Sequence, residues 1–193
     1  MIIDLLRDRC SVRKFLDKEI PNDIINSIIE AGRLSPSGGN EQPWKFGIIT
    51  DKSLICRISE LARNQSWIKS APLLIILCTT VVEDARGARD IQKYRFPRWC
   101  EEIDKMDKEL YSCINMEEHQ TKIPGTHMIL RALEYGVSST WISYFDVDKV
   151  ANLLYLPELY IPSEVIAFGY SAEKMKLRPK KSVKEITFYN KFE

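Results

Sequence analysis

Residues 36–44 read Pro36-Ser37-Gly38-Gly39-Asn40-Glu41-Gln42-Pro43-Trp44, and this stretch decides the fold because it separates two segments of different periodicity. Before it, isoleucines recur at one-and-four spacing and predict an amphipathic helix over residues 21–34, entered through a proline. Pro36 disfavours helical geometry at the residue before it and ends that helix. After it, residues 45–50 predict a short strand. The stretch is therefore a loop between a helix and the edge of a sheet.

The residue types in this loop indicate a binding role. Gly38 and Gly39 let the backbone approach a partner without a Cβ in the way. Asn40 and Gln42 each offer an amide with a donor and an acceptor, which suits a planar heterocycle whose edge alternates acceptor, donor and acceptor. The same residue types also form ordinary polar turns, so both interpretations stay open at this point.

Composition limits the class of protein. The chain has 193 residues, 45% hydrophobic and 28% charged, which predicts a single domain over residues 1–193 with one sizeable core. A formal net charge of +1 gives no electrostatic case for nucleic acid or a membrane surface. The first turns carry Asp4 and Arg7, and we find no signal peptide and no apolar stretch of membrane-spanning length.

The thiols and imidazoles predict neither a disulfide framework nor a metal site. The cysteines are odd in number, scattered and without a Cys-x-x-Cys pair, which fits free thiols in a reducing cytoplasm. They are Cys10, Cys56, Cys78, Cys100 and Cys113. The only histidines are His119 and His127, and His127 sits in an apolar helical stretch, where we expect packing rather than metal binding.

Two cationic pairs near the ends of the chain predict a phosphate site. An extended segment would place Arg9, Ser11 and Arg13 on one side, presenting two guanidinium groups and a hydroxyl. Lys176 and Arg178 repeat the alternate-residue pairing near the C-terminus. The two pairs could converge on one dianionic phosphate, and the alternative for each is a solvated charged segment.

The remaining elements follow from periodicity and capping signals. The chain predicts a helix over 51–63 capped by Asp51 or Ser53, a central strand over 71–78 covered on both faces, a helix over 126–135 ended by Gly136, a strand over 139–145, a helix over 147–154 capped by Asp146, a loop bracketed by Pro157 and Pro162, and a strand over 165–170. Residues 82–123 predict a helical insertion that is either a surface hairpin or a lid over a pocket.

Taken in order, these motifs resemble the nitroreductase family of FMN-dependent oxidoreductases. The resemblance lies in Arg9-x-Ser11-Val12-Arg13-x-Phe15, Pro36-Ser37-x-x-Asn40-x-Gln42-Pro43-Trp44, Ala71-Pro72, Thr140-Trp141-Ile142 with Phe145-Asp146, and Gly169-Tyr170-x-Ala172-Glu173-Lys174. It implies an α+β fold with a mainly antiparallel central sheet surrounded by helices. It also implies an intertwined homodimer with FMN at the interface. Residues 171–193 of each subunit would extend toward the partner subunit.

The resemblance implies a site built around the flavin. The N-terminal motif and the C-terminal cations would bind its phosphate and ribityl chain. The loop of residues 37–42 from the partner subunit, Asn64 and Gln65, and the strand end at Ile142 and Ser143 would contact its ring. The implied cofactor-binding residues are Arg9, Cys10, Ser11, Arg13, Ser37, Gly38, Asn40, Gln42, Asn64, Gln65, Ile142, Ser143, Lys176 and Arg178. The backbone of Ser143 would approach flavin N5, and Arg13 or Lys14 would lie near N1 and O2. Many relatives have glycine where this chain has Ser143, and the bulky Tyr144 follows it.

The implied reaction takes hydride from NADH or NADPH and reduces a small oxidant, such as a nitroaromatic or a quinone, in a ping-pong cycle. FMN carries the chemistry, so no side chain acts as a nucleophile. Two alternatives remain: a divergent member that catalyses reductive dehalogenation or flavin degradation, and a flavin-binding module without catalysis.

Overall fold

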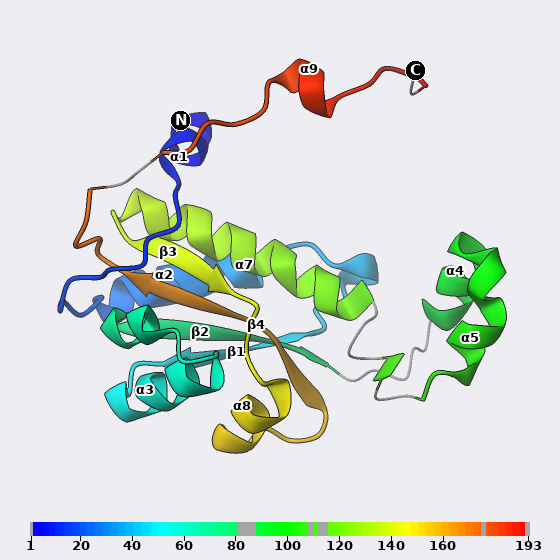
Figure 1. Cartoon of the computed structure of the whole chain (residues 1–193), viewed down its shortest axis with the longest axis horizontal. Helices are drawn as coiled ribbons and strands as arrows, with labels where there is room; N and C mark the ends of the chain where they lie inside the picture. The colour runs from blue at the N-terminus through cyan, green and yellow to red at the C-terminus, as the bar shows by residue number, and fades with distance from the viewer. Residues whose placement is uncertain (1, 81–87, 108–109, 112–115, 175–176, 192–193) are drawn as a thin grey trace.

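The computed structural model describes residues 2–80, 88–107, 110–111, 116–174 and 177–191 (Figure 1). Its centre is a four-stranded sheet with the strand order β1-β2-β4-β3, in which every neighbouring pair is antiparallel. The strands are β1 (Trp44–Ile49), β2 (Leu73–Thr80), β3 (Ser138–Ile142) and β4 (Tyr160–Gly169). The predicted α+β fold with an antiparallel sheet is confirmed.

The helices lie where local signals begin and end them. The α-helices are α1 (Ile2–Asp8), α2 (Asn22–Arg33), α3 (Lys52–Leu61), α4 (Ala88–Arg95), α5 (Cys100–Lys105), α7 (Met116–Glu134), α8 (Val147–Leu153) and α9 (Val183–Ile186), and the 3₁₀ helices are η1 (Gly38–Asn40), η2 (Ser66–Ser70) and η3 (Pro97–Trp99). The Asp51 carboxylate accepts a hydrogen bond from the Leu54 N–H at 2.8 Å, so Asp51 is the cap of α3. Gly136 follows α7 with φ +70°, as a glycine at a helix end does.

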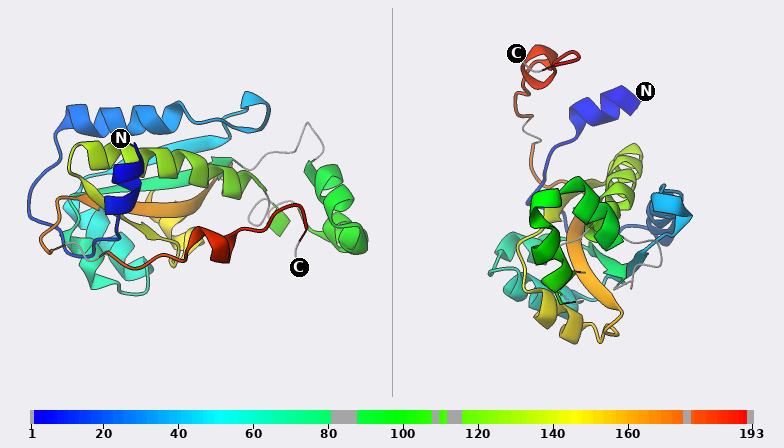
Figure 2. Two further views of the ribbon diagram at one scale, coloured as in Figure 1. Left: turned by 90° about the horizontal axis from the view of Figure 1, so that it is seen from above. Right: turned by 90° about the vertical axis from the view of Figure 1, so that its right-hand side faces the viewer.

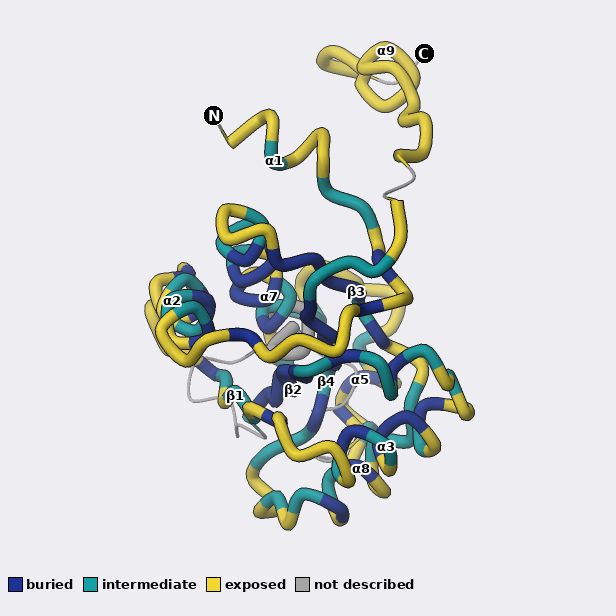
Figure 3. The backbone as a smooth tube through the Cα atoms, turned by 90° about the vertical axis from the view of Figure 1, so that its left-hand side faces the viewer, coloured by how far each residue is buried: buried dark blue, intermediate teal, exposed yellow. Residues whose placement is uncertain are grey.

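The sheet is covered on both faces, which confirms the prediction for its apolar central strand. Leu73, Ile75 and Leu77 of β2 pack in one cluster with residues of α2 and α7. The alternate side chains of β2 pack in a second cluster with α3 and α8 on the other face. Figure 3 shows the layers end-on, with α2 and α7 on one side of the sheet and α3 and α8 on the other. None of the helices in the described ranges is long and apolar enough to cross a membrane.

Helix α7 begins ten residues before its predicted start at Thr126, so that boundary was wrong. Pro124 and Gly125 lie inside the helix, and the local signal that they give for a helix break is overridden by packing. A Cβ on Gly125 would lie 2.4 Å from Cη2 of Trp141 and 2.7 Å from Cδ1 of Leu77. The glycine therefore lets α7 lie close against β2 and β3.

The loop predicted between Pro157 and Pro162 is also wrong, because β4 begins at Tyr160 and contains Pro162. Leu77 pairs with Glu164 but Cys78 pairs with Pro162, so Ser163 is the extra residue of a β-bulge. A proline lacks the N–H that a regular ladder needs, and strands accommodate it at bulges. The Ser163 hydroxyl donates to the Leu77 carbonyl at 3.0 Å, and Oγ1 of Thr121 in α7 lies 2.6 Å from the same hydroxyl.

Strand β3 ends three residues before the predicted end at Phe145. The chain instead turns toward the end of α3, where the Asp146 N–H donates to the Leu61 carbonyl at 3.1 Å. Asp146 then caps α8, as predicted, by accepting from the Lys149 N–H at 3.1 Å. This early turn leaves Ser143 and Tyr144 exposed at the end of the edge strand.

Two parts of the chain stand apart from the sheet. Helices α1 and α9 project from the body near the two termini (Figures 1 and 2), and neither contains a buried residue. Helices α4 and α5 lie together beyond one end of the sheet. They belong to the segment predicted as an insertion or lid, and that role stays a prediction.

The buried thiol of Cys78 offers a test of the core. Burial raises its pKa to about 12, so at pH 8 it is almost wholly protonated and shielded. We expect native wild-type protein and Cys78→Ala to release equal amounts of thionitrobenzoate from Ellman's reagent, whereas in denaturant the variant releases one equivalent less. Loss of a fast-reacting thiol from the native variant would contradict the buried position.

Candidate functional site

The N-terminal motif lies along the outer edge of β3. The Val12 N–H donates to the Ser139 carbonyl at 3.3 Å, and the Thr140 hydroxyl donates to the Val12 carbonyl at 2.6 Å. Val12 is 1% exposed, whereas Ser11 and Arg13 on either side of it are exposed. The predicted alternation therefore holds where the motif meets the sheet, and it presents a hydroxyl and a guanidinium at this edge.

The chain that follows β4 lies against the same motif. The Leu16 N–H donates to the Tyr170 carbonyl and the Ala172 N–H to the Lys14 carbonyl, both at 2.8 Å. The Arg13 N–H also donates to the Glu173 carboxylate at 3.3 Å. Arg178, five residues beyond Glu173, is exposed, and Lys176 lies outside the described residues. The segment that leads to the C-terminal cations thus adjoins the N-terminal motif, and convergence of the two cationic pairs stays a prediction.

A third segment, residues 62–70, completes this edge. The Arg13 guanidinium lies 5.9 Å from the centre of the Trp67 ring, and the Phe15 N–H donates to the Ser70 hydroxyl at 3.2 Å. Asn64, just after the end of α3, has φ 55°, a left-handed conformation in which asparagine is enriched among non-glycine residues. The Gln65 amide donates to the Ala62 carbonyl at 3.0 Å and to the Tyr144 carbonyl at 3.5 Å.

The end of β3 contributes its backbone and one hydroxyl. The Ile142 side chain is 2% exposed and packs in the core, so only its main chain can face a ligand. Ser143 is exposed, and its hydroxyl donates to the carboxylate of Glu164 in β4. Cys10 likewise packs its side chain against the core. The segments around Arg13, Gln65 and Ser143 therefore form one linked surface at the edge of the sheet.

The loop of residues 37–42 lies elsewhere in the same chain. It precedes β1, which is the opposite edge strand of the sheet from β3 (Figure 1). The Gly38 N–H donates to the Gln120 side chain of α7, and the Gln42 N–H donates to the Ser37 hydroxyl, both at 2.8 Å. Asn40 and Gln42 are exposed, with φ 60° and 53°. The structure therefore does not bring this loop to the β3 edge within one chain.

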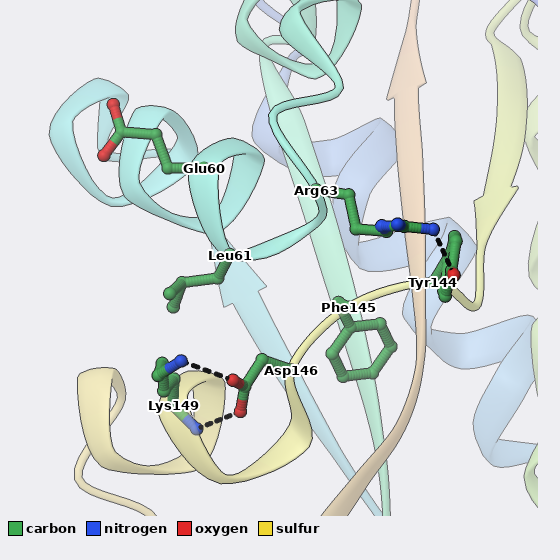
Figure 4. A pocket seen from close by; sticks show the side chains of 7 residues that line it. All are labelled: Glu60, Leu61, Arg63, Tyr144, Phe145, Asp146 and Lys149. Carbon is green, nitrogen blue, oxygen red and sulfur yellow. Dashed lines mark hydrogen bonds and ion pairs between the residues drawn. The ribbon is translucent and has the colours of Figure 1, made fainter.

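An open cavity of about 350 Å³ lies beside the residues that follow Ser143 (Figure 4). It is lined by Glu60, Leu61, Arg63, Tyr144, Phe145, Asp146 and Lys149. The Arg63 guanidinium lies 4.3 Å from the centre of the Tyr144 ring and donates to its hydroxyl. This cation–π pair gives the cavity a cationic wall.

Neither the Arg63–Tyr144 pair nor Glu164 was predicted from the sequence. Arg63 and Tyr144 are 81 positions apart and meet only because β3 ends early. Glu164 directly precedes the predicted strand over 165–170, and a carboxylate at the border of an apolar run was the one signal that could have drawn attention to it.

The Asp146 cap beside the cavity gives stability a dependence on pH. The hydrogen bond from the Lys149 ammonium, at 2.8 Å, and the bond from the Lys149 N–H lower the pKa of Asp146 below its ordinary value of 3.8. A carboxyl with a lowered folded-state pKa stabilises the fold above 3.8, and this stabilisation is lost as the pH falls through the folded-state pKa.

We therefore expect Asp146→Ala to lower the melting temperature at pH 7 and to differ progressively less from wild type as the pH is lowered below 3.8. Asp148→Ala is the matched control, because it removes an exposed carboxylate from the first turn of the same helix without removing the cap. Thermal unfolding followed by circular dichroism measures both. Equal melting temperatures for the two variants at pH 7 would contradict the capping role.

The sequence of this chain matches a known protein family over most of its length. A family model described as the Nitroreductase family matches residues 6–170, which is most of the chain. The chain belongs to the nitroreductase family. As a member, the protein is an oxidoreductase.

Nitroreductase relatives match over nearly the whole chain. An NADH dehydrogenase of Thermus thermophilus is 25% identical over 179 residues, covering 86% of this chain and 84% of the relative. An FMN reductase [NAD(P)H] of Bacillus subtilis is 22% identical over 179 residues, covering 93% of this chain and 69% of the relative. The solved structure of an FMN-dependent nitroreductase from Clostridium difficile superposes with a TM-score of 0.74 at 23% identity, covering 98% of this chain and 99% of that one. The nitroreductase fold expected from the motifs is therefore confirmed.

Proposed function

We propose that this nitroreductase binds FMN along the outer edge of β3, takes hydride from NADH or NADPH, and reduces small oxidants such as nitroaromatics or quinones in a ping-pong cycle. The observation that carries the proposal is the linked surface of three segments around Arg13, Gln65 and Ser143. Relatives named FMN reductase [NAD(P)H] and FMN-dependent nitroreductase support the choice of cofactor and of electron donor. When bound, FMN supplies the site that accepts and returns hydride.

The donor set along this edge suits the phosphate end of FMN. The exposed Ser11 hydroxyl and Arg13 guanidinium, with Arg9 beside them, offer one neutral donor and two cations to a dianion. Lys176 and Arg178 would add their charges from the C-terminal segment, which passes the same motif. Hydrogen bonds to the sheet hold the backbone of the motif in place, so little conformational entropy is lost when a phosphate binds.

The other end of the edge suits the ring. In the proposed complex the main-chain N–H of Ser143 would donate to the reactive end of the flavin ring, and Asn64 and Gln65 would contact its polar rim. Arg13 or Lys14 would stabilise negative charge near N1 and O2 after reduction. The exposed ring of Tyr144 would then border the face on which nicotinamide and oxidant alternate, with Arg63 behind it.

The active form that we propose is a homodimer. Helix α1 exposes Ile2, Ile3 and Leu6, and the segment around α9 exposes Val183, Ile186, Phe188 and Tyr189. Projecting helices with exposed apolar side chains are poorly stabilised alone, because helices gain most of their stability from packing. A second subunit would cover them, and its loop carrying Ser37, Gly38, Asn40 and Gln42 would reach the flavin site that its own chain does not reach.

The test is the visible spectrum of the purified protein, followed by anaerobic addition of NADH and then NADPH. We expect flavin absorbance that bleaches with at least one donor and returns with p-nitrobenzoate or benzoquinone. Absorbance that stays oxidised with both donors would favour a flavin-binding module. Bleaching without reoxidation by either oxidant would favour a divergent reaction such as dehalogenation or flavin degradation. A colourless protein that FMN does not reconstitute would overturn the proposal.

A further inference from the structure

Glu164 is unusual among the residues that the structure describes, because it is the one charged side chain that is fully buried, with 3% of its surface exposed. Both carboxylate oxygens have partners. Oε1 lies 3.2 Å from the Lys122 ammonium of α7, and Oε2 accepts the hydrogen bond from the Ser143 hydroxyl. Lys122 is itself 42% exposed, so the carboxylate is the deeply buried member of the pair.

The sheet register explains why Glu164 meets Ser143. The last pair of the β3–β4 ladder is Ile142 with Val165, so the next positions, Ser143 and Glu164, lie directly opposite each other. The bulge at Ser163, next to Glu164, shifts the register of β4 against β2, and the pairing resumes with Pro162 opposite Cys78. The Glu164 side chain therefore holds Ser143 from the neighbouring strand after β3 has ended.

Stability alone does not account for a carboxylate here. Removing a charge from water is costly, and replacing a buried ion pair by apolar side chains of similar size is often neutral or stabilising. The surrounding positions on this face, Trp141 and Ile166, are apolar and pack in the cluster beneath α7. A leucine at position 164 would extend that cluster, whereas the carboxylate gives the Ser143 hydroxyl a fixed acceptor.

We propose that Glu164 is a positioning residue that acts through Ser143. By accepting the Ser143 hydroxyl hydrogen, it fixes the first residue after β3, so that the Ser143 main-chain N–H keeps one orientation toward the cofactor. Lys122 balances the charge of Glu164 from α7. This inference rests on the proposed function, because it assigns to Ser143 the contact with the reactive end of the flavin.

The test compares Glu164→Leu, Glu164→Gln and Ser143→Ala as full-length FMN-free proteins titrated with FMN. We expect Glu164→Leu to unfold close to the wild-type temperature, because the Lys122 ammonium that it leaves is 42% exposed and can be hydrated. We expect it to bind FMN about three- to tenfold more weakly, the range for loss of one hydrogen bond. Its bound flavin should also show a shifted visible spectrum and a changed midpoint potential. Glu164→Gln keeps an oxygen that can accept from Ser143 and should restore affinity and spectrum.

The Ser143→Ala variant decides whether Glu164 acts through the hydroxyl. We expect it to reproduce the loss seen in Glu164→Leu, and the double variant to bind no more weakly than either single one. The positioning role would be overturned if Glu164→Leu kept the wild-type FMN affinity and spectrum. It would also be overturned if Ser143→Ala did not share the loss of affinity, or if Glu164→Gln did not restore it. Failure of the wild-type protein to bind FMN would instead overturn the proposed function.

Discussion

Arg13→Ala is expected to weaken FMN binding by about ten- to a hundredfold. A hydrogen bond to a charged group contributes about 1.5–3 kcal/mol, and each 1.4 kcal/mol corresponds to about a tenfold change in affinity. The guanidinium is exposed and makes no ion pair with a described carboxylate, so the fold loses only its stacking near Trp67. Fluorescence titration of the FMN-free protein measures the dissociation constant directly.

Two further variants separate the geometry of this contact from its charge. Arg13→Lys keeps a cation but lacks the planar fork that matches phosphate oxygens, so we expect an intermediate loss. Arg57→Ala removes another exposed guanidinium, from α3, and should leave the dissociation constant unchanged. Wild-type affinity in both Arg13→Ala and Arg178→Ala would remove the phosphate assignment from this edge.

Gly125→Val is expected to lower the free energy of unfolding by about 3 kcal/mol, the upper end of the usual cost of overpacking a core. A Cβ at this position already lies 2.4 Å from Trp141 and 2.7 Å from Leu77, and the added methyl groups would crowd the same atoms. Helix α7 would have to move away from the sheet, because the indole ring of Trp141 cannot rotate freely in a packed layer. Urea denaturation of the FMN-free protein gives the difference.

Gly32→Ala, in α2, is the matched control for this prediction. The three atoms nearest to a Cβ on Gly32 all belong to the flexible side chain of Met128, and the nearest of them is its terminal methyl group. The gain in helix propensity from glycine to alanine, about 1 kcal/mol, works against the remaining crowding, so we expect a small net effect. Equal stabilities for Gly125→Val and wild type would show that α7 does not depend on its close approach to the sheet.

Local signals in the sequence predicted most elements of this fold. They failed where contacts with residues distant in the sequence determine where a helix or strand begins or ends. The spacing of isoleucines, the cap at Asp51 and the glycine at position 136 act within one or two turns, and each was confirmed. Pro124 and Pro162 carry local signals of a break, but packing of α7 and a bulge in β4 accommodate them. Neither accommodation can be read from neighbouring residues in the sequence.

The candidate site likewise contains features that local sequence signals predict and features that depend on distant contacts. Residue alternation was enough to predict that Ser11 and Arg13 would be presented together on an exposed edge. The partnership of Glu164 with Ser143 depends on strand register, and the stacking of Arg63 on Tyr144 depends on where β3 ends. The sequence order of the motifs also did not reveal that the loop of residues 37–42 adjoins the edge strand opposite to β3.

Left-handed backbone geometry is concentrated in the two loops assigned to the flavin. Of the six non-glycine residues with positive φ in the described chain, four are Asn40, Gln42, Arg63 and Asn64. Each such residue costs about 1–3 kcal/mol relative to relaxed backbone. Selection for heat resistance alone would place glycine at these positions. If these loops hold the flavin as proposed, their strained residues mark where the chain gives up thermal robustness for a backbone shape that is ready before the ligand arrives.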